Sequence, residues 1–431
     1  MTYTLEKSTV GIIGLGYVGM PLALMLAKNV PTLGFDLFER RISELQSGWD
    51  SNREIKQSEL RTTNCKFTNN IEDLKSCNVF IITVPTPLDS KNNPDLTAVK
   101  SASESIGKIL KKGDVVVYES TVYPGVTEDI CGPILESNSG LTCGVDFFLG
   151  YSPERINPGD TKHTVQNITK VVAGQTEEIT SFLAKLYGSI NNDNIFQAKN
   201  IKTAEASKAI ENAQRDINVA FVNEITIILD KLGLSSYDVL EAAKTKWNFL
   251  NFYPGLVGGH CIGVDPYYFA HCAEEQGYSP EVILSGRRTN DSMGLFIADK
   301  IHETLKDEIS TSPKRILLLG FTFKENINDI RNTKVIDIYH ALIKAGHHVD
   351  IHDPFARLED VKNQYNISLL ESLSVKDKYD CVGLMVGHNV YEDMTAASVE
   401  SLLNPNHGTI YDIKGMWRDT SFSSHYVYKT L

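Results

Sequence analysis

A glycine-rich turn near the start of the chain constrains the fold most strongly. A short β-branched run over residues 9–13 ends at Gly14, and a helical pattern covers residues 18–29. A second apolar run ends at Asp36, the spacing expected for the acidic residue of a dinucleotide-binding βαβ unit. The turn has a Gly-x-Gly-x-x-Gly pattern made by Gly14, Gly16 and Gly19. The chain is therefore predicted to begin with a doubly wound α/β lobe.

Each residue of this pattern has a physical reason to occupy its position. Gly14 allows the tight turn, Gly16 lets the backbone approach a pyrophosphate, and Gly19 permits close contact between helix and strand. Asp36 would accept hydrogen bonds from the adenosine ribose and would repel a 2′-phosphate, and Arg41 is placed to cover the adenine. A glycine-rich turn without a ligand is the alternative. The complete context favours NAD over NADP.

Composition limits the classes of protein that the chain can belong to. It has 431 residues, a net charge of −12, 42% hydrophobic and 22% charged residues. Such a chain is typical of a globular protein of about three domains rather than a disordered, collagen-like or disulfide-scaffold protein. The acidic balance argues against general binding to nucleic acid or anionic membranes. Seven scattered cysteines fit a reducing compartment.

One uncharged run is long enough for a membrane span. It covers the 18 residues 10–27, but four glycines and Pro21 interrupt it, which makes a membrane helix a poor explanation. Residues 1–7 are polar, so no signal peptide is expected before it. We therefore expect a cytoplasmic protein without a membrane segment.

The rest of the chain predicts a second lobe of the same kind. Apolar strands alternate with helical stretches up to about residue 198, and a helical period then runs from 203 to 232. A strand, a turn at Gly320 and a helix follow Lys314, so that the opening pattern returns. The predicted fold is α/β, with two Rossmann-like doubly wound lobes joined by a long central helix. The predicted domains cover 1–198, 199–310 and 311–431.

A second motif surrounds Cys261. Three glycines flank this cysteine (Gly258, Gly259 and Gly263), and Asp265 follows four residues later. A thiolate is a strong nucleophile that can hold an aldehyde carbon covalently. A buried cysteine with no reactive role is the alternative, and the spacing alone leaves both open. The His260-Cys261 and His271-Cys272 pairs lack zinc-site spacing, so we predict no metal.

Further polar residues fall where ligands often bind. Lys208, Asn212 and Arg215 share one face of the long helix, although the pattern alone favours a solvated polar face. Other groups follow strands, whose carboxyl ends form the binding edge of open α/β sheets. They are the segments 119–121, 152–155 and 320–331.

In this order, these segments resemble the UDP-glucose/GDP-mannose dehydrogenase family over nearly the whole chain. The resemblance rests on residues 14–21, 119–121, 151–154, Lys208 with Asn212, 258–265 and 324–331. Residues 259–268 look like the branch that oxidises N-acetylated UDP-hexosamines. The UDP-glucose branch usually has serine at the position of His260. Many members of that branch also have an arginine where this chain has Thr245, which leaves a contact to a neighbouring subunit in doubt.

The resemblance implies a chemistry for the conspicuous residues. The family oxidises the C6 alcohol of a sugar twice, to a carboxylate, and consumes two NAD⁺. Cys261 would be the nucleophile that forms a thiohemiacetal and then a thioester. Lys208 and Asn212 would stabilise oxyanions at C6.

The remaining roles also follow from the resemblance. Asp265 and Thr121 would hold a water for proton transfer, and Glu154 is a candidate base for hydrolysis. The implied cofactor contacts are Gly14, Gly16, Tyr17, Val18, Gly19, Asp36, Arg41, Thr86, Thr121 and Arg331. The implied substrate contacts are Glu154, Arg155, Lys208, Asn212, Tyr253, Gly255, Gly258 and Lys324, with Arg287 a weaker candidate. The long helix would join two subunits in a homodimer or a larger homo-oligomer.

The expected function is NAD-dependent oxidation of UDP-N-acetylglucosamine or UDP-N-acetylgalactosamine to the uronic acid, for surface polysaccharide. UDP-glucose, UDP-N-acetylmannosamine and GDP-mannose are alternative substrates. A catalytically silent nucleotide-binding regulator and a single-step 2-hydroxy-acid dehydrogenase are alternatives of other classes. The sequence leaves the sugar epimer open.

Overall fold

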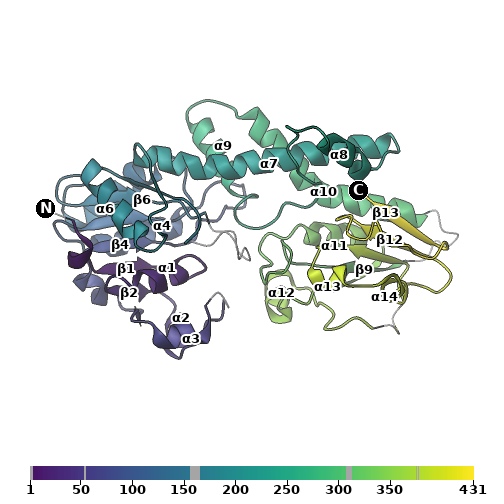
Figure 1. Cartoon of the computed structure of the whole chain (residues 1–431), viewed down its shortest axis with the longest axis horizontal. Helices are drawn as coiled ribbons and strands as arrows, with labels where there is room; N and C mark the ends of the chain where they lie inside the picture. Colours follow the sequence, from purple (N-terminus) through teal and green to yellow (C-terminus); the bar gives the residue numbers. More distant parts are fainter. Residues whose placement is uncertain (1–2, 53–54, 156–165, 307–312, 375, 377) are drawn as a thin grey trace. The chain divides into compact units, whose positions relative to one another are not determined.

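The structure of the protein is a computed structural model that describes residues 3–52, 55–155, 166–306, 313–374, 376 and 378–431. The chain divides into two compact units (Figure 1). The first unit contains Met1–Glu211 and Tyr267–Ser279, and the second contains Asn212–Pro266 and Pro280–Leu431.

The first unit contains an eight-stranded sheet with the order β3-β2-β1-β4-β5-β6-β7-β8. Neighbouring strands are parallel except for β6 and β7, which are antiparallel. The strands are β1 (Val10–Ile13), β2 (Thr32–Phe35), β3 (Lys66–Thr68), β4 (Val79–Ile82), β5 (Val115–Tyr118), β6 (Phe148–Tyr151), β7 (Lys170–Gly174) and β8 (Ile195–Gln197). Strands β1, β4 and β5 are buried throughout, because a parallel sheet is covered on both faces.

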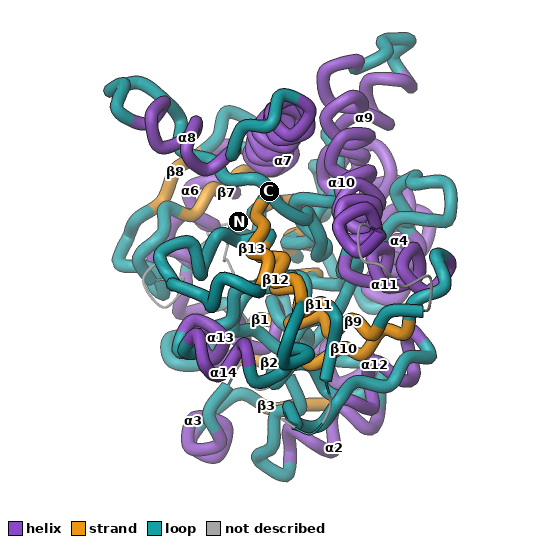
Figure 2. Tube along the Cα trace, turned by 90° about the vertical axis from the view of Figure 1, so that its right-hand side faces the viewer, coloured by secondary structure: helices purple, strands orange, loops and turns teal. Residues whose placement is uncertain are grey.

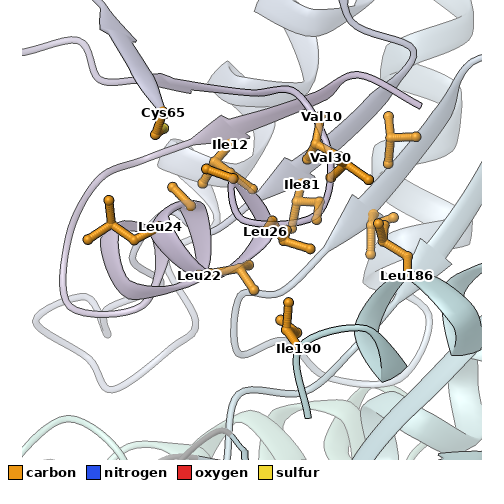
Figure 3. Close-up of a cluster of buried hydrophobic side chains, with 14 of the residues drawn as sticks. Val10, Ile12, Leu22, Leu24, Leu26, Val30, Cys65, Ile81, Leu186 and Ile190 are labelled. Carbon is orange, nitrogen blue, oxygen red and sulfur yellow. The ribbon is translucent and has the colours of Figure 1, made fainter. Parts of the chain in front are cut away.

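Helices pack against this sheet through an aliphatic core (Figure 3). Leu22 and Leu26 of α1 lie with Ile12 and Ile81 of the strands and Leu186 of α6 in one buried cluster. The helices are α1 (Gly19–Leu26), α2 (Glu39–Gln46), α3 (Gln57–Thr62), α4 (Thr97–Gly107), α5 (Gly132–Ser139) and α6 (Glu177–Gly188). Shorter helical turns cover Leu5–Lys7, Ile71–Ser76 and Val126–Cys131. The strand order reverses between β1 and β4, which is where open sheets of this kind bind ligands.

The second unit contains a five-stranded parallel sheet with the order β10-β9-β11-β12-β13, which Figure 2 shows side by side. Its strands are β9 (Arg315–Leu319), β10 (His348–His352), β11 (Cys381–Leu384), β12 (Gly408–Asp412) and β13 (Tyr426–Thr430). Its helices are α8 (Ser236–Lys244), α10 (Glu281–Lys306), α11 (Val335–Lys344), α12 (Leu358–Tyr365), α13 (Asn389–Glu392) and α14 (Ala396–Glu400). The predicted fold class of two doubly wound lobes is therefore confirmed.

Two helices contribute residues to both units. Helix α7 (Ile201–Lys231) has 31 residues and is about 46 Å long at the usual rise per residue. Its residues up to Glu211 belong to the first unit and those from Asn212 to the second. Helix α9 (Asp265–Glu275) begins in the second unit and continues in the first. Among the described helices, none combines the length and apolar character that crossing a bilayer requires.

Candidate active site

The glycine-rich turn of the first unit has the geometry of a dinucleotide loop. Gly14 follows β1 with a φ of 95°, and its carbonyl accepts a hydrogen bond from Thr83 Oγ1 at 2.7 Å. Asp36 follows β2, and its Oδ2 accepts the Leu15 N–H at 2.9 Å while its Oδ1 accepts the Phe38 N–H at 3.0 Å. These bonds fix the carboxylate beside the loop, where the sequence pattern places it.

The two other glycines of the turn are required for different reasons. A Cβ on Gly19 would lie 1.9 Å from the Gly14 carbonyl oxygen, so only glycine lets the helix approach the strand. A Cβ on Gly16 would meet no atom within 4 Å, because it would project into open space. An open backbone at this position fits the pyrophosphate of NAD, whose approach a side chain would block.

This contrast predicts opposite outcomes for two alanine substitutions. We expect Gly16→Ala to weaken NAD binding about tenfold without lowering the melting temperature, because the added methyl group occupies only the ligand's space. Gly19→Ala should lower the melting temperature, because its methyl group overlaps the backbone. Calorimetric titration with NAD and thermal unfolding would measure both effects. Unchanged NAD affinity in Gly16→Ala would contradict the assignment.

Arg41 supports the same loop through contacts within the protein. Its Nε donates to the Leu15 carbonyl at 2.9 Å, and its Nη1 lies 2.8 Å from Oδ1 of the buried Asp50. Tyr17 and Val18 are half-buried in the loop, and the Thr86 carbonyl accepts a hydrogen bond from Tyr268 at 2.8 Å. Their predicted contacts with the cofactor remain predictions.

A buried ion pair lies at the carboxyl end of β5. Glu119 accepts a hydrogen bond from Lys170 at the start of β7, and Tyr187 Oη donates to Glu119 Oε2 at 2.7 Å. Burial raises the pKa of Glu119 to about 7, an effect that Lys170 opposes and the charge of Glu154 strengthens. The predicted residues Thr121 and Glu154 are half-buried at the ends of neighbouring strands β5 and β6.

Lys170 and Tyr187 were not predicted from the sequence as partners of Glu119. The sequence did contain one signal, because Lys170 directly precedes the apolar residues of β7. A lysine next to a buried strand is rarely buried without a partner of opposite charge. Arg155, predicted to bind substrate, forms an ion pair with Glu211 at 2.9 Å and donates to the Thr169 carbonyl at 2.8 Å.

The buried side of α7 contributes two charged residues to the first unit. Lys208 is 7% exposed. Glu205 is fully buried, and its carboxylate accepts the Gly125 N–H at 2.6 Å and the Thr127 N–H at 2.9 Å. Burial raises the pKa of Glu205 to about 7. Lys208 therefore lies in a largely desolvated position, where its charge acts more strongly than it would in water.

Three of the predicted catalytic residues come together in the second unit. Asn212 Nδ2 donates a hydrogen bond to Oδ2 of the fully buried Asp265. The carbonyl of Cys261 accepts the backbone N–H groups of Val264 at 3.1 Å and Asp265 at 2.8 Å, so the cysteine loop leads directly into α9. Cys261 itself is half-buried. None of the seven cysteines, all of which are described, forms a disulfide.

The glycines before Cys261 are needed for packing against the protein's own backbone. A Cβ on Gly258 would lie 2.8 Å from the Asn332 carbonyl oxygen, and one on Gly259 would lie 2.7 Å from the ring of Phe323. The Gly259 N–H donates to the Arg331 carbonyl at 3.2 Å, and Asn332 Nδ2 donates to the Gly259 carbonyl at 3.1 Å. The cysteine loop is therefore held against the segment after β9.

A cavity of about 380 Å³ lies beside this loop, within the second unit. Its volume is in the range of small-molecule sites. Four predicted substrate residues line it: Tyr253, Gly255, Gly258 and Lys324. Its lining also contains Arg215, Phe252, Phe323, Glu325, Lys334 and Lys414.

Positive charge dominates the lining of this cavity. Lys414 forms an ion pair with Glu325 at 2.7 Å, and Lys334 forms one with Asp291 at 3.0 Å. Arg215 and Lys324 add two further cations, so the lining has four basic groups and one acidic group. Such a lining suits an anionic ligand such as a diphosphate.

Two predicted arginines lie outside the cavity lining. The Arg331 guanidinium forms a two-pronged contact with Asp329, with Nε 3.0 Å from Oδ1 and Nη2 2.5 Å from Oδ2. Arg287 is 2% exposed and pairs with Asp216 at 2.5 Å and Asp291 at 2.7 Å. Among the described residues, no group of three or more His, Cys, Asp or Glu side chains gathers as metal ligands would.

The fold and the dinucleotide loop are those of a dinucleotide-binding protein. Three family models match the chain: the NAD binding domain of the UDP-glucose/GDP-mannose dehydrogenase family over residues 8–191, its central domain over 202–292 and its UDP binding domain over 317–419. The chain belongs to the UDP-glucose/GDP-mannose dehydrogenase family. The predictions of the family and of NAD as its cofactor are thereby confirmed.

Individual relatives are similar over nearly the whole chain. UDP-N-acetyl-D-glucosamine 6-dehydrogenase of Pseudomonas aeruginosa is 50% identical over 94% of this chain and 96% of its own length. Protein CapL of Staphylococcus aureus is 48% identical over 94% of this chain and 96% of its own. The solved structure of UDP-D-ManNAc dehydrogenase from Pyrococcus horikoshii aligns with a TM-score of 0.87 at 29% identity, covering 98% of each chain.

Proposed function

We propose that the protein oxidises the C6 alcohol of UDP-N-acetyl-D-glucosamine to a carboxylate. Each sugar would consume two NAD⁺ and one water and would release two NADH and protons. The 50% identity to a protein named UDP-N-acetyl-D-glucosamine 6-dehydrogenase carries the substrate assignment. The uronic acid product would be a precursor of surface polysaccharide.

Cys261 is the proposed nucleophile of the second oxidation. Loss of a proton and a hydride converts the C6 alcohol to an aldehyde, and Cys261 Sγ adds to the aldehyde carbon to give a thiohemiacetal. When bound, NAD⁺ would be the acceptor of the hydride lost in each oxidation. Loss of a second hydride leaves a thioester, and water then cleaves the C–S bond to release the carboxylate and restore the thiol.

The neighbours of Cys261 support this chemistry. The hydrogen bond from Asn212 to the buried Asp265 fixes the side-chain amide and carboxylate against each other beside the cysteine loop. Asn212 and Lys208 are proposed to stabilise the oxyanion at C6. Asp265 and Thr121 are proposed to hold a water, and Glu154 is proposed to activate the water that hydrolyses the thioester.

Ligand contacts and domain limits complete the proposal. The NAD contacts are proposed at the glycine-rich loop, at Asp36 and Arg41, and at Thr86, Thr121 and Arg331. The sugar nucleotide is proposed to contact four residues of the cavity lining, Tyr253, Gly255, Gly258 and Lys324. It is also proposed to contact Glu154, Arg155, Lys208 and Asn212. We also propose an NAD domain over 1–198, a central domain over 199–310 and a UDP-sugar domain over 311–431.

A panel of nucleotide sugars tests the substrate. We expect kcat/KM for NADH formation to be highest with UDP-N-acetylglucosamine, and lower by at least about tenfold with UDP-glucose, UDP-N-acetylmannosamine and GDP-mannose. Preference for UDP-glucose or for GDP-mannose would contradict the proposal. Tight binding of NAD and UDP-sugars without any NADH formation would instead indicate a regulatory protein.

A homodimer is proposed from an apolar surface on α7 and the segment after it. Phe221, Ile228 and Leu232 are 56%, 46% and 65% exposed and recur on one face of the helix. Trp247 and Leu250, beyond α8, are 91% and 62% exposed. Large exposed apolar side chains that recur on one helix face are typical of a surface that a partner covers.

Charge on this surface should separate the subunits. We expect Phe221→Asp with Ile228→Asp to weaken self-association about a hundredfold, because both carboxylates would be buried against apolar side chains. Sedimentation velocity across a concentration series would measure it. Val145→Asp, which changes an apolar side chain 71% exposed elsewhere in the chain, is the control and should leave the dimer intact. A wild-type monomer would contradict the proposal.

A further inference from the structure

The two lobes of the fold place an aspartate at equivalent positions. In the first lobe, Gly14 follows β1 and Asp36 follows β2. In the second lobe, Gly320 follows β9 with a φ of 97°, and Asp353 follows β10. Asp353 Oδ2 accepts the N–H of Phe321 at 2.6 Å, just as Asp36 Oδ2 accepts the N–H of Leu15, the residue after its own glycine.

The second aspartate is used differently from the first. Asp36 is half-buried, whereas Asp353 is only 3% exposed. Asp353 Oδ1 accepts the N–H groups of Phe355 at 2.8 Å and Ala356 at 3.1 Å, and its Oδ2 lies 3.0 Å from His388 Nε2. Burial alone would raise the pKa of Asp353, but His388 and the backbone donors lower it to about 2. Its oxygens therefore bind protein groups rather than a ribose.

His388 lies after β11, beside the point where the strand order of the second lobe reverses. It is fully buried, and its ring stacks on Phe355 at 4.7 Å between centroids. Its Nδ1 accepts the Asn326 N–H at 2.9 Å. Because Nδ1 is an acceptor in this bond, Nε2 is the ring nitrogen that donates to Asp353.

A second set of bonds holds the same loop. Asn326 has a φ of 59°, its Nδ2 donates to Asn389 Oδ1 at 2.8 Å, and its Oδ1 accepts the Asn389 N–H at 3.0 Å. Thr322 Oγ1 donates to the Lys324 carbonyl at 2.9 Å. The loop held in this way is residues 322–326, and four of its members line the cavity: Thr322, Phe323, Lys324 and Glu325.

We propose that His388 is a positioning residue for the nucleotide of the substrate. The ring is oriented by Asp353 and fixes the 322–326 loop through Asn326, so that Lys324 and Phe323 are presented to the cavity. Asp36 of the first lobe is proposed to face the cofactor ribose. Asp353, at the equivalent position of the second lobe, would instead support the UDP site from within the protein. This inference rests on the proposed function, because it takes the cavity as the UDP-sugar site.

Two substitutions of His388 separate its bond at Nδ1 from its contacts at Nε2, which lies 3.0 Å from Asp353 Oδ2 and 3.3 Å from Thr322 Oγ1. His388→Asn places an amide oxygen near the position of Nδ1 and retains an acceptor for Asn326. His388→Gln places an amide nitrogen near the position of Nε2 and retains the donor to Asp353, but loses that acceptor. Calorimetric titration with UDP and with NAD, together with thermal unfolding, measures each variant of the full chain.

We expect His388→Gln to raise the Kd for UDP and the KM for the UDP-sugar about tenfold, and His388→Asn to raise them no more than about threefold. The Kd for NAD should stay unchanged in both. UDP binding by His388→Gln as tight as wild type would overturn the proposal. An equal loss of NAD and UDP affinity would also overturn it, because that indicates a general structural role.

Asn326→Gly keeps the proposal testable if neither histidine variant folds. Glycine tolerates the positive φ but removes the side-chain bonds to Asn389, so UDP binding should weaken about threefold and NAD binding should not change. The variant keeps the backbone N–H that bonds to His388, so unchanged UDP affinity would contradict the premise that fixing the 322–326 loop controls UDP binding, and a wild-type protein that binds no UDP would overturn the proposal. A wild type that binds UDP without oxidising UDP-N-acetylglucosamine would contradict only the proposed function.

Discussion

Replacing Cys261 by alanine is expected to lower the rate of uronic acid formation by at least about a thousandfold, while the affinity for UDP and NAD stays near that of wild type. The thiol is the only group proposed to bond to the aldehyde carbon. Without it the thiohemiacetal, from which the second hydride is lost, cannot form. Cys261→Ser should also be severely impaired, because an alcohol is a much weaker nucleophile than a thiolate. Steady-state formation of the uronic acid from UDP-N-acetylglucosamine, followed together with NADH, measures both variants.

Cys272→Ala is the matched control for this experiment. Cys272 lies on α9, eleven residues after Cys261 in sequence, and is also half-buried. Burial raises the pKa of its thiol, and it has no proposed role in catalysis. NADH formation should therefore remain within about twofold of wild type. A comparable loss in the two alanine variants, or full activity in Cys261→Ala, would contradict the covalent mechanism.

Lys208→Met is expected to lower kcat by about 10² to 10³-fold with a much smaller effect on KM. Methionine keeps most of the length and apolar character of the lysine side chain but removes the charge. Lys208 is 7% exposed, so its charge is poorly screened and would stabilise an oxyanion at C6 strongly. Steady-state kinetics with NAD and UDP-N-acetylglucosamine varied separately distinguish kcat from the two KM values.

Lys202→Met provides the comparison on the same helix. Lys202 is half exposed and pairs with Asp129 at 2.7 Å, an ion pair of the kind that contributes little to stability or catalysis. Its removal should leave kcat unchanged. If Lys208→Met raised only a KM and left kcat intact, Lys208 would be a binding residue rather than a stabiliser of the oxyanion.

The parts of the fold that the sequence predicts well are those with local signals. Strands β1, β4 and β5 are uninterrupted apolar runs, because both faces of a parallel sheet are buried, and the glycine-rich loop has a fixed spacing. The short strands β3 and β8, and the carboxyl-terminal strand β13, were not predicted. They are partly exposed strands at or near sheet edges, so their sequences lack an uninterrupted apolar run.

The contacts that complete the sites depend on residues far apart in sequence. The sequence shows Gly258 and Gly259 only as glycines that flank Cys261, whereas the structure packs them against Asn332 and Phe323. The pair of Glu119 with Lys170 joins residues 51 positions apart, and that of Asp353 with His388 joins residues 35 apart. One sequence shows the residue types of such pairs but not their partners, because a tertiary contact leaves no local pattern.

The number of NADH molecules formed per UDP-N-acetylglucosamine consumed tests the central claim most directly. With the sugar limiting and NAD in excess, the four-electron oxidation predicts two NADH for each sugar and a product that is the uronic acid by mass. One NADH per sugar with an aldehyde product, or consumption of NAD without the uronic acid, would contradict the account.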